Sequence, residues 1–356
     1  MARPKQRPKG AGRGQYSVAL IEGDGVGPEV SKASLVILDA LRKKLGLRIA
    51  IKHAPAGDDC KRTTGVALPD SSLKTILGSD ACLKAPVGET AADVILRLRQ
   101  LLDLYANIRP AKSLPGVPSL KPGIDLVIVR ENTEDLYKGQ EFEFAGGVVA
   151  LRTITRFASE RIAKYAFELA EQRGGARKVV AVHKANVLRK SDGLFSQVCR
   201  EVSKAYPNVS FSEMLVDAAA MNLIRDPLSF DVIVTTNLYG DILSDEAAQL
   251  VGGLGMTPSA NIGEEFALFE PVHGAAVDIA GKGVANPVAM ILTVAMMLDW
   301  LAKTRQDKLC AAGASAIRTA VSRVLDANTR TPDLGGKATT VQVAEAVAAA
   351  ISKYPS

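Results

Sequence analysis

The most informative stretch of the chain is FDVIVTTNLYGDILSDE, residues 230–246. Its first half is an apolar, β-branched run that predicts a buried strand, and its second half predicts a helix carrying Asp241 and Asp245. Two aspartates four residues apart lie on one face of a helix, one turn from each other. The turn from strand to helix is where open α/β sheets place their ligands, so the pair marks a candidate Mg²⁺ or Mn²⁺ site. From the spacing alone, two unrelated acids on a solvated helix face are the more common explanation.

Strand-like runs alternate with helix-like runs along most of the chain, which is typical of an α/β protein. Residues 29–45 predict an amphipathic helix that ends at Gly46, residues 94–105 a further helix, and residues 148–155 a strand. The loop GDGVG at 23–27 follows a predicted strand and precedes a helix, but it lacks the G-x-G-x-x-G fingerprint of Rossmann domains. Close approach of a ligand and a tight structural turn both explain this loop.

The composition is that of a globular chain, with 356 residues of which 47% are hydrophobic and 23% charged, long enough for two domains. The net charge of +6 comes mostly from the leader MARPKQRPKGAGRGQ, residues 1–15, which contains five basic residues and no acid. We expect this leader to be disordered, because it is rich in Pro and Gly and has no apolar run. It has no aromatic residues among its charges, so nucleic acid is not an expected partner.

The four cysteines, Cys60, Cys82, Cys199 and Cys310, are scattered and form no C-x-x-C pair. This pattern favours reduced thiols and a cytoplasmic location. The longest apolar stretch, residues 288–298, is shorter than the roughly 20 residues that span a bilayer, so we expect a core helix and no membrane role.

Several single residues are candidates for substrate chemistry. Arg99, Arg109 and Arg130 stand near the ends of predicted elements, and arginine forks bind carboxylates through two hydrogen bonds. The trio therefore suits a substrate with two or more carboxylates, although three surface arginines would look the same. Tyr137 and Lys184 are candidate proton carriers, and either could be structural.

Seven motifs decide between these alternatives. They are IEGDGVGPEV at 21–30, LRQLLDLYANIRP at 98–110, VRENTEDLYKG at 129–139, HKANVLRKSDGLF at 183–195, NLYGDILSDEAA at 237–248, SANIG at 259–263 and EPVHGAAVDIAGKGVANP at 270–287. With these motifs in this order, the chain from residue 16 resembles the isocitrate and isopropylmalate dehydrogenases, a family of β-decarboxylating dehydrogenases.

The resemblance implies a two-domain α/β fold with open mixed sheets flanked by helices and without a Rossmann fingerprint. The expected parts are the leader 1–15, a discontinuous cofactor-binding domain made of 16–108 and 253–356, and a substrate, metal and dimerisation domain at 109–252. It also implies an obligate homodimer, with a higher oligomer left open, whose active sites combine residues of both subunits.

Roles for the candidate residues follow from the same resemblance. Arg99, Arg109 and Arg130 would clamp the malate portion of the substrate. Asp241 and Asp245 would hold the divalent metal together with Asp217 of the partner subunit. Tyr137 and the partner's Lys184 would carry protons, and Lys184 would need to be neutral to accept one. The dinucleotide would be bound by Asn186, Glu270, His273, Gly274, Asp278, Ile279 and Asn286.

The choice of cofactor and substrate is expected to depend on a few of these positions. The carboxylate of Asp278 would accept hydrogen bonds from the adenosine ribose and repel a 2′-phosphate, which favours NAD over NADP. Ile95, Leu96 and Val187 of the partner subunit would form an apolar wall that suits an isopropyl group. We therefore expect oxidative decarboxylation of 3-isopropylmalate, with homoisocitrate and isocitrate as alternatives and D-malate or tartrate further off. A non-catalytic subunit would lack the metal ligands, Tyr137 or Lys184, all of which are present.

Overall fold

A computed structural model describes residues 14–355. Residues 1–13, most of the leader that we expect to be disordered, lie outside the described residues. The last two residues of that leader belong to the folded body instead. Gln15 begins the first strand, and the Gly14 amide donates a hydrogen bond to the buried carboxylate of Asp307 at 2.7 Å. The expected boundary at residue 15 is therefore two residues too late.

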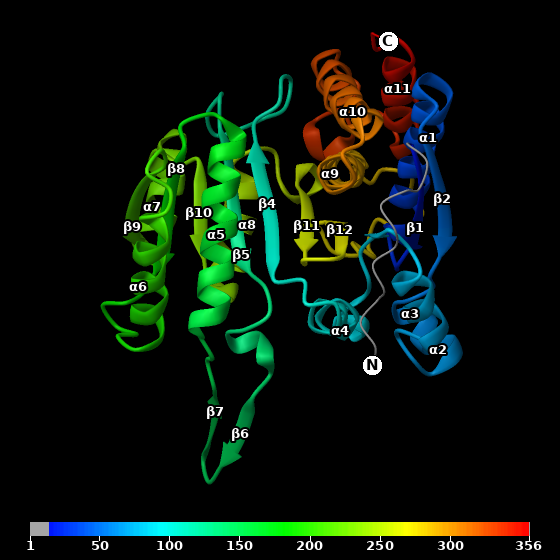
Figure 1. Cartoon of the computed structure of the whole chain (residues 1–356). Coiled ribbons are helices and arrows are strands. Elements are labelled where there is room, and N and C mark those ends of the chain that lie inside the picture. Colours follow the sequence, from blue (N-terminus) through cyan, green and yellow to red (C-terminus); the bar gives the residue numbers. More distant parts are fainter. Residues whose placement is uncertain (1–13, 356) are drawn as a thin grey trace.

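One ten-stranded mixed sheet, in the order β2-β1-β3-β12-β11-β4-β5-β10-β8-β9, runs through the molecule (Figure 1). Its strands are β1 (Gln15–Ile21), β2 (Arg48–His53), β3 (Ala81–Lys84), β4 (Ala106–Lys112), β5 (Asp125–Glu131), β8 (Lys178–His183), β9 (Ser210–Leu215), β10 (Val232–Thr235), β11 (Pro258–Ile262) and β12 (Ala267–Pro271). The pairs around β11 and β4 are antiparallel and the outer pairs are parallel. A separate hairpin of β6 (Glu141–Phe144) and β7 (Gly147–Ala150) projects from the body.

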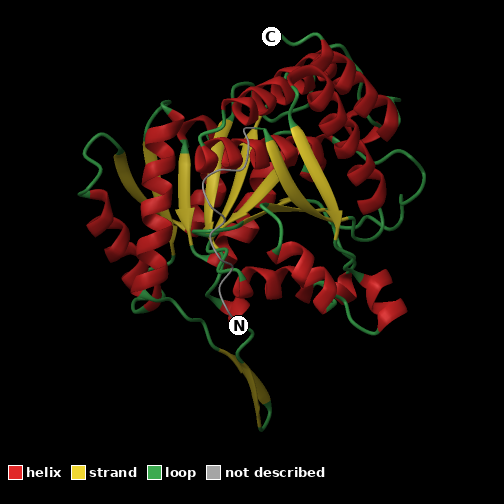
Figure 2. Cartoon of the chain, turned by 45° about the vertical axis from the view of Figure 1, so that its right-hand side comes forward, coloured by secondary structure: helices red, strands yellow, loops and turns green. Residues whose placement is uncertain are grey.

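Helices cover both faces of this sheet (Figure 2). They are α1 (Gly27–Leu45), α2 (Asp58–Thr64), α3 (Asp70–Leu77), α4 (Asp93–Leu101), α5 (Arg156–Arg173), α6 (Ser191–Ser203), α7 (Val216–Arg225), α8 (Asn237–Gln249), α9 (Val288–Arg305), α10 (Lys308–Asp326) and α11 (Thr340–Ser352). The α/β class and the large mixed sheet flanked by helices, both expected from the sequence, are confirmed.

The central strands have helices on both sides, which explains why they read as continuous apolar runs. In β10 every residue is buried. Val232 and Val234 belong to the core cluster that includes α5 and α6, whereas Ile233 belongs to the cluster under α7 and α8. The alternation of side chains along a strand thus supplies two cores from one short segment.

Two expected elements are shorter than predicted. The helix expected over 94–105 ends at Leu101, and Ala106 already begins β4. Between them Asp103 adopts a left-handed conformation with φ of 45°, which ends the helix, and Leu104 is fully buried. The strand expected over 148–155 stops at Ala150, where the hairpin ends.

The expected core helix at 288–298 is part of α9, whose apolar residues are mostly buried. Among the described residues, no helix combines the length and the apolar character needed to cross a bilayer. All four cysteines are free thiols, and burial raises the pKa of Cys82 to about 12. Unpaired thiols agree with the expectation from their spacing.

Candidate active site

Asp241, in the first turns of α8, is the centre of a cluster of side chains from four elements. Its Oδ1 accepts a hydrogen bond from Nη1 of Arg130 on β5 and lies 3.1 Å from Nη2 of Arg109 on β4. Its Oδ2 accepts a hydrogen bond from the Tyr137 hydroxyl at 2.5 Å. One turn further along α8, Asp245 lies 3.0 Å from Nη1 of Arg109. The structure therefore brings together five of the predicted site residues.

The charges of this cluster favour an anionic ligand. Burial alone would raise the pKa of Asp241, but Arg130 and Arg109 outweigh it and lower the pKa, so this carboxylate is ionised. Burial, together with the neighbouring charges of Arg109 and Arg99, lowers the pKa of Arg130 to about 9. Arg109 and Arg99 lie close enough to disfavour the charge of Arg130, and an added carboxylate would offset this repulsion.

Arg130 also has an unused donor. Its side chain is only 1% exposed, and its Nε donates to Oδ1 of Asn237 at 2.9 Å. Its Nη2 is buried and has no hydrogen-bond partner among the described residues. A buried guanidinium N–H without a partner is costly, so this atom is arranged for an acceptor that a ligand would bring.

Arg99 belongs to a second, fully buried network. Its Nε donates to Oδ1 of Asn261 at 3.0 Å, and its Nη2 lies 3.4 Å from Oε1 of Glu270 on β12. The same Oε1 of Glu270 accepts a hydrogen bond from the Asn261 amide at 2.9 Å, and its Oε2 accepts one from Lys84 at 2.8 Å. Burial alone would raise the pKa of Glu270, but Lys84 and Arg99 lower it to about 2. This network fixes the direction of the Arg99 fork.

Lys84 and Asn261 were not singled out from the sequence. The position of Lys84 could have indicated its role, because it is the last residue of the short apolar strand β3. Arg130 has a similar position near the end of the apolar strand β5. A charged residue at the end of a buried strand has to find a partner, and the ends of such strands are where sites form.

A pocket of about 780 Å³ lies beside these two networks. Its lining includes seven of the predicted substrate and cofactor residues, namely Ile95, Arg99, Arg109, Glu270, His273, Gly274 and Asp278. The other predicted substrate and cofactor residues lie outside its lining, namely Leu96, Arg130, Asn186, Val187, Ile279 and Asn286. Of these, Leu96 is half-buried, and Asn286 is buried with its amide on Oδ2 of Asp333 at 2.9 Å.

The glycine loop of β1–α1 supports this pocket from behind. The Asp24 amide donates to the Pro86 carbonyl at 2.9 Å, and the Val26 amide donates to the Ala275 carbonyl at 2.8 Å. A Cβ at Gly25 would lie 2.0 Å from the Ala275 carbonyl oxygen. Pro86 and Ala275 line the pocket, whereas the loop itself does not. Of the two explanations open from the sequence, the tight structural turn is the one that the geometry supports.

Lys184 and Asp217 form a separate pair. Nζ of Lys184 donates a hydrogen bond to Oδ1 of Asp217 at 2.5 Å. Two residues that the resemblance assigns to the partner's active site are therefore neighbours within one chain. Nearby, Asn186 is exposed, and the side chain of Val187 is 66% exposed.

The donor chemistry fits a divalent metal and a dinucleotide in part. Asp241 and Asp245 supply carboxylate oxygens, the ligands that Mg²⁺ and Mn²⁺ prefer. Within residues 14–355 of one chain, no three His, Cys, Asp or Glu side chains are placed together to hold a metal. In the pocket, Nε2 of His273 is buried and has no hydrogen-bond partner in the described part of the chain, and burial lowers the pKa of this imidazole. A neutral imidazole with a free nitrogen fits a polar ligand group.

The mixed α/β fold and the arginine–aspartate cluster together have the character of an enzyme site for a small anionic molecule. The sequence profile of the family described as Isocitrate/isopropylmalate dehydrogenase matches residues 17–349, so the chain belongs to this family.

Known relatives agree with this assignment. The chain is 53% identical to a 3-isopropylmalate dehydrogenase of Archaeoglobus fulgidus, over 93% of this chain and 98% of that protein. It is 48% identical to an isocitrate/homoisocitrate dehydrogenase of Thermus thermophilus, over 94% of this chain and 98% of that protein. Among solved structures, it resembles isocitrate dehydrogenase from Methylococcus capsulatus with a TM-score of 0.89 and 40% identity, over 95% of this chain and all of that one.

Proposed function

We propose that this enzyme catalyses the NAD-dependent oxidative decarboxylation of 3-isopropylmalate to 4-methyl-2-oxopentanoate and CO₂, a step of leucine biosynthesis. The observation that carries the proposal is the buried Arg130, which lies close to Arg99, Arg109 and Asp241 and whose Nη2 has no hydrogen-bond partner within residues 14–355. The names of relatives at 53% identity support the same substrate. Homoisocitrate and isocitrate are the alternatives, supported by the relative at 48% identity.

In this proposal the arginines bind and orient the two carboxylates of the substrate. Arg99 is fixed by Asn261 and Glu270, and Arg109 is fixed by Asn107 at 2.7 Å, so both forks are held before substrate arrives. Ile95 lines the same pocket and would contact the isopropyl group. A third carboxylate there would be desolvated by an apolar side chain without a partner, which disfavours the tricarboxylates.

Asp241 and Asp245 would hold the Mg²⁺ or Mn²⁺ ion, with Asp217 of the partner subunit as a third ligand. A bound divalent ion would act as a Lewis acid toward the substrate hydroxyl and its neighbouring carboxylate. Asp241 is already ionised and its Oδ2 accepts a hydrogen bond from the Tyr137 hydroxyl, so both of its oxygens face the site, which suits a metal ligand. Burial raises the pKa of Asp245, whereas a cation bound beside it would lower that pKa and favour the ionised carboxylate.

NAD would occupy the part of the pocket between Glu270 and Asp278 and would accept the hydride. Asp278 is exposed at the pocket edge and has no ion-pair partner among the described residues, so its charge is free to repel a 2′-phosphate. His273 and the backbone near Gly274 supply polar atoms beside it. Asn186, Ile279 and Asn286 remain proposed contacts.

Tyr137 and Lys184 would move the protons. Burial raises the pKa of Tyr137, and Asp241 raises it further, so the hydroxyl keeps its proton and can donate it. Lys184 is paired with Asp217 in the same chain, and this contact has to be released before the amine can accept a proton. If Asp217 serves as a metal ligand, it no longer holds Lys184, and the amine is free to approach the substrate hydroxyl.

We further propose a homodimer in which Lys184, Val187 and Asp217 serve the partner's active site. Exposed apolar side chains on α7 and α8, Met221 and Ile242 among them, support an interface there. The division into a cofactor-binding domain of 16–108 and 253–356 and a substrate and dimerisation domain of 109–252 is part of this proposal. So is a cytoplasmic location, which the free thiols support.

The test is a comparison of kcat/KM for 3-isopropylmalate, homoisocitrate, isocitrate and D-malate, each with NAD and with NADP in the presence of Mg²⁺. We expect kcat/KM for 3-isopropylmalate with NAD to exceed the other values by at least about tenfold, because a polar group placed in an apolar pocket weakens binding by about this factor. A preference for a tricarboxylate would overturn the substrate assignment, and a preference for NADP would overturn the role of Asp278.

A further inference from the structure

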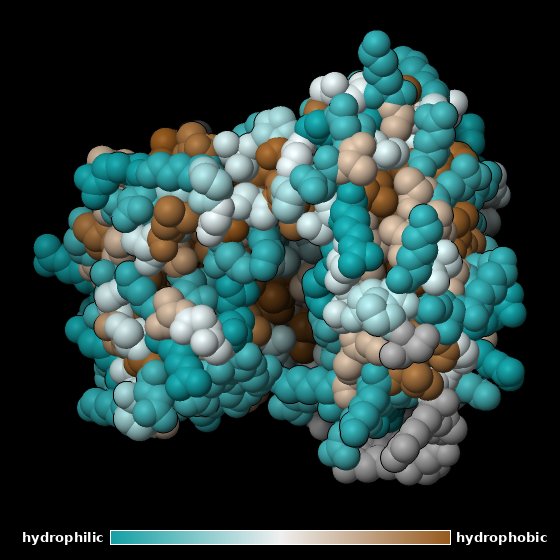
Figure 3. Space-filling view, turned by 90° about the horizontal axis from the view of Figure 1, so that it is seen from above, coloured by the Kyte–Doolittle hydropathy of each residue, from teal (hydrophilic) through white to brown (hydrophobic). Residues whose placement is uncertain are grey.

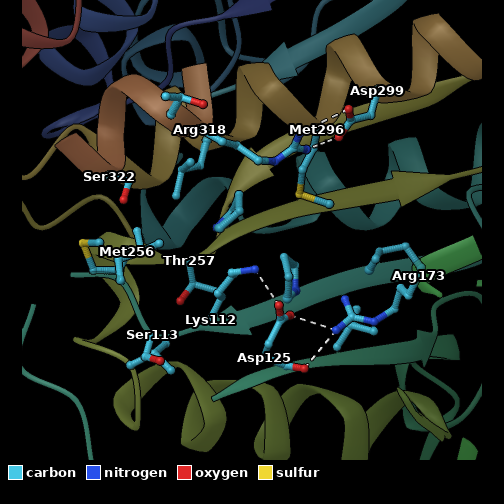
Figure 4. A pocket seen from close by; sticks show the side chains of 18 of the residues that line it. Lys112, Ser113, Asp125, Arg173, Met256, Thr257, Met296, Asp299, Arg318 and Ser322 are labelled. Atoms are coloured by element: carbon cyan, nitrogen blue, oxygen red, sulfur yellow. Dashed lines mark hydrogen bonds and ion pairs between the residues drawn. The ribbon is translucent and has the colours of Figure 1, made fainter. Parts of the chain in front are cut away.

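A second large pocket, of about 800 Å³, lies on the opposite face of the sheet from the active site. Its walls come from β4, β5 and α5 on one side and from β11, α9 and α10 on the other (Figure 4). Seen from above, the molecule is deeply hollowed between its two halves, with hydrophobic atoms at the bottom of the hollow (Figure 3). We name this space, lined by β4, β5, β11, α5, α9 and α10, the rear pocket.

The alternation of β4 separates the two pockets. Ile108 and Pro110 line the rear pocket, whereas Arg109 between them lines the active-site pocket. The same holds on β11, where Pro258 lines the rear pocket and Ser259 lines the active-site pocket. The rear pocket is therefore separate from the substrate and cofactor sites and uses none of the residues assigned to them.

The interior of the rear pocket is mainly aliphatic. Val127, Leu292, Met296 and Met256 are among its lining residues, and none of the lining residues is aromatic. Without an aromatic side chain there is no surface on which a nucleobase could stack. Methionine side chains adapt their shape to apolar ligands, and the volume is in the range of small-molecule sites.

The polar lining has an excess of positive charge. Four basic side chains face two acidic ones in this lining. Lys112 and Arg173 both bind Asp125, at 2.5 and 2.8 Å, and Arg318 binds Asp299. Arg323 on α10 is exposed and, within the described part of the chain, has no acidic partner. One guanidinium at the pocket is therefore available to a ligand.

We propose that the rear pocket binds an aliphatic amphipathic anion, with its carboxylate on Arg323 and its hydrocarbon chain against Met296 and Leu292. The aliphatic lining favours a flexible hydrocarbon chain, and the unpaired Arg323 favours an anionic head over a cationic or neutral one. A highly charged ligand would not match, because the other three cations already have acidic partners.

Isothermal titration calorimetry of the full-length protein with octanoate tests this proposal. NAD is kept at saturating concentration so that the cofactor pocket is not available to the fatty acid. Octanoate is expected to bind, and octylamine, which has the same chain and a cationic head, is expected not to bind. Arg323→Glu is expected to raise the Kd for octanoate by about tenfold or more, which corresponds to about 1.4 kcal/mol of binding free energy.

Lys308→Glu is the matched control, because it reverses a charge on an exposed residue of the same helix outside the pocket, and it should leave octanoate binding unchanged. Met296→Gln is a second variant that tests the chain-binding wall without changing charge, and it should also weaken binding. Circular dichroism confirms that each variant is folded. Absence of octanoate binding, equal binding of octylamine, or equal affinity in Arg323→Glu and Lys308→Glu would each overturn the proposal.

Discussion

Asp24 joins three segments of backbone at the rim of the active-site pocket. Its buried carboxylate accepts hydrogen bonds from the amides of Asp58, Asp59 and Gly88, at 2.8, 3.0 and 2.7 Å. Gly57 packs so closely that a Cβ there would lie 2.3 Å from Oδ2 of Asp24. Because Asp58 and Gly88 line the pocket, this one side chain fixes the position of part of its wall.

Asp24→Asn should therefore loosen this wall. The variant loses the charge and one acceptor oxygen, and its NH₂ group would face a backbone donor. Hydrogen bonds to charged groups contribute about 1.5–3 kcal/mol each, so we expect the free energy of unfolding in urea to fall by about 2–3 kcal/mol, with a raised KM. Asp59→Asn is the control, since it removes the exposed ion pair with Arg62. The loss of this pair should lower the free energy of unfolding by about 1 kcal/mol or less. Equal losses in both variants would contradict this role of Asp24.

Because of Glu270, the free energy of unfolding of the protein should depend on pH in the range below the ordinary pKa of a glutamate carboxyl. Its pKa falls from 4.5 to about 2, despite burial, because of Lys84 and Arg99. A carboxyl whose pKa is lowered on folding stabilises the protein above the unfolded pKa and loses this contribution as the pH falls toward the folded pKa. We expect the stability difference between wild type and Glu270→Gln to narrow by roughly 2 kcal/mol between about pH 5 and pH 3. A difference independent of pH in urea titrations would contradict the shift.

At the residue scale, the sequence predicted which side chains form the cluster but not how they pair. Asp241 and Asp245 share a helix face by spacing alone, and their motifs assigned the arginines and Tyr137. The contact of Lys184 with Asp217 joins the end of β8 to α7, and that of Lys84 with Glu270 joins β3 to β12, which are far apart in sequence. Such pairs depend on the strand order, which local patterns do not determine.

At the scale of elements, the packing of α8 against β5 depends on the absence of a side chain at Gly240. A Cβ there would lie 2.5 Å from Cγ and 2.6 Å from Cβ of Arg130, so Gly240→Ala has to displace this arginine. Misplacing a substrate-binding group by about 1 Å can cost 100-fold, and we expect kcat/KM to fall by about that factor.

Gly193→Ala in α6 is the matched control for this substitution. A Cβ at Gly193 meets no atom within 4 Å, so alanine there should raise the stability by up to about 1 kcal/mol through helix propensity. Steady-state kinetics and thermal unfolding of both variants measure the two effects. Unchanged activity of Gly240→Ala would mean that Arg130 tolerates the displacement.

The elements that the sequence predicted well are those with a strong local signal. The buried run of β10, the helix α1 ending at Gly46, and the apolar helix α9 all have one. The start of β4 was missed because LLDLY at 101–105 continues the helical pattern of α4. There the burial of Leu104 and the pairing of Ala106 with Ile262 decide the structure, and both are tertiary contacts.

At the scale of the whole molecule, the exposed apolar surface indicates where a second copy would bind. Met221 and Ile224 on α7 are 67% and 58% exposed, and Ile242 on the adjacent α8 is 59% exposed. The β6–β7 hairpin also exposes Phe142 and Phe144. Exposed apolar side chains concentrated on neighbouring elements are typical of an interface between subunits. Lys184 and Asp217 would then be the residues that each chain contributes to its partner.

Shared active sites predict that two inactive variants restore each other. Tyr137→Phe and Lys184→Ala should each lower kcat by about 10²–10⁴-fold as homodimers. In a mixed dimer, one site combines both defects, whereas the other has Tyr137 from one chain and Lys184 from its partner, and is intact. Differently tagged chains, co-expressed and purified as the mixed dimer, should therefore recover about half of the wild-type kcat per dimer.

If each site were built from a single chain, every site of the mixed dimer would keep one defect and no activity would return. A mixed dimer that carries Tyr137→Phe in both chains and Lys184→Ala in one is the control, and it should stay inactive in either case. Because both parent variants keep the Asp241, Asp245 and Asp217 carboxylates, recovered turnover reports on how the two chains combine rather than on metal affinity.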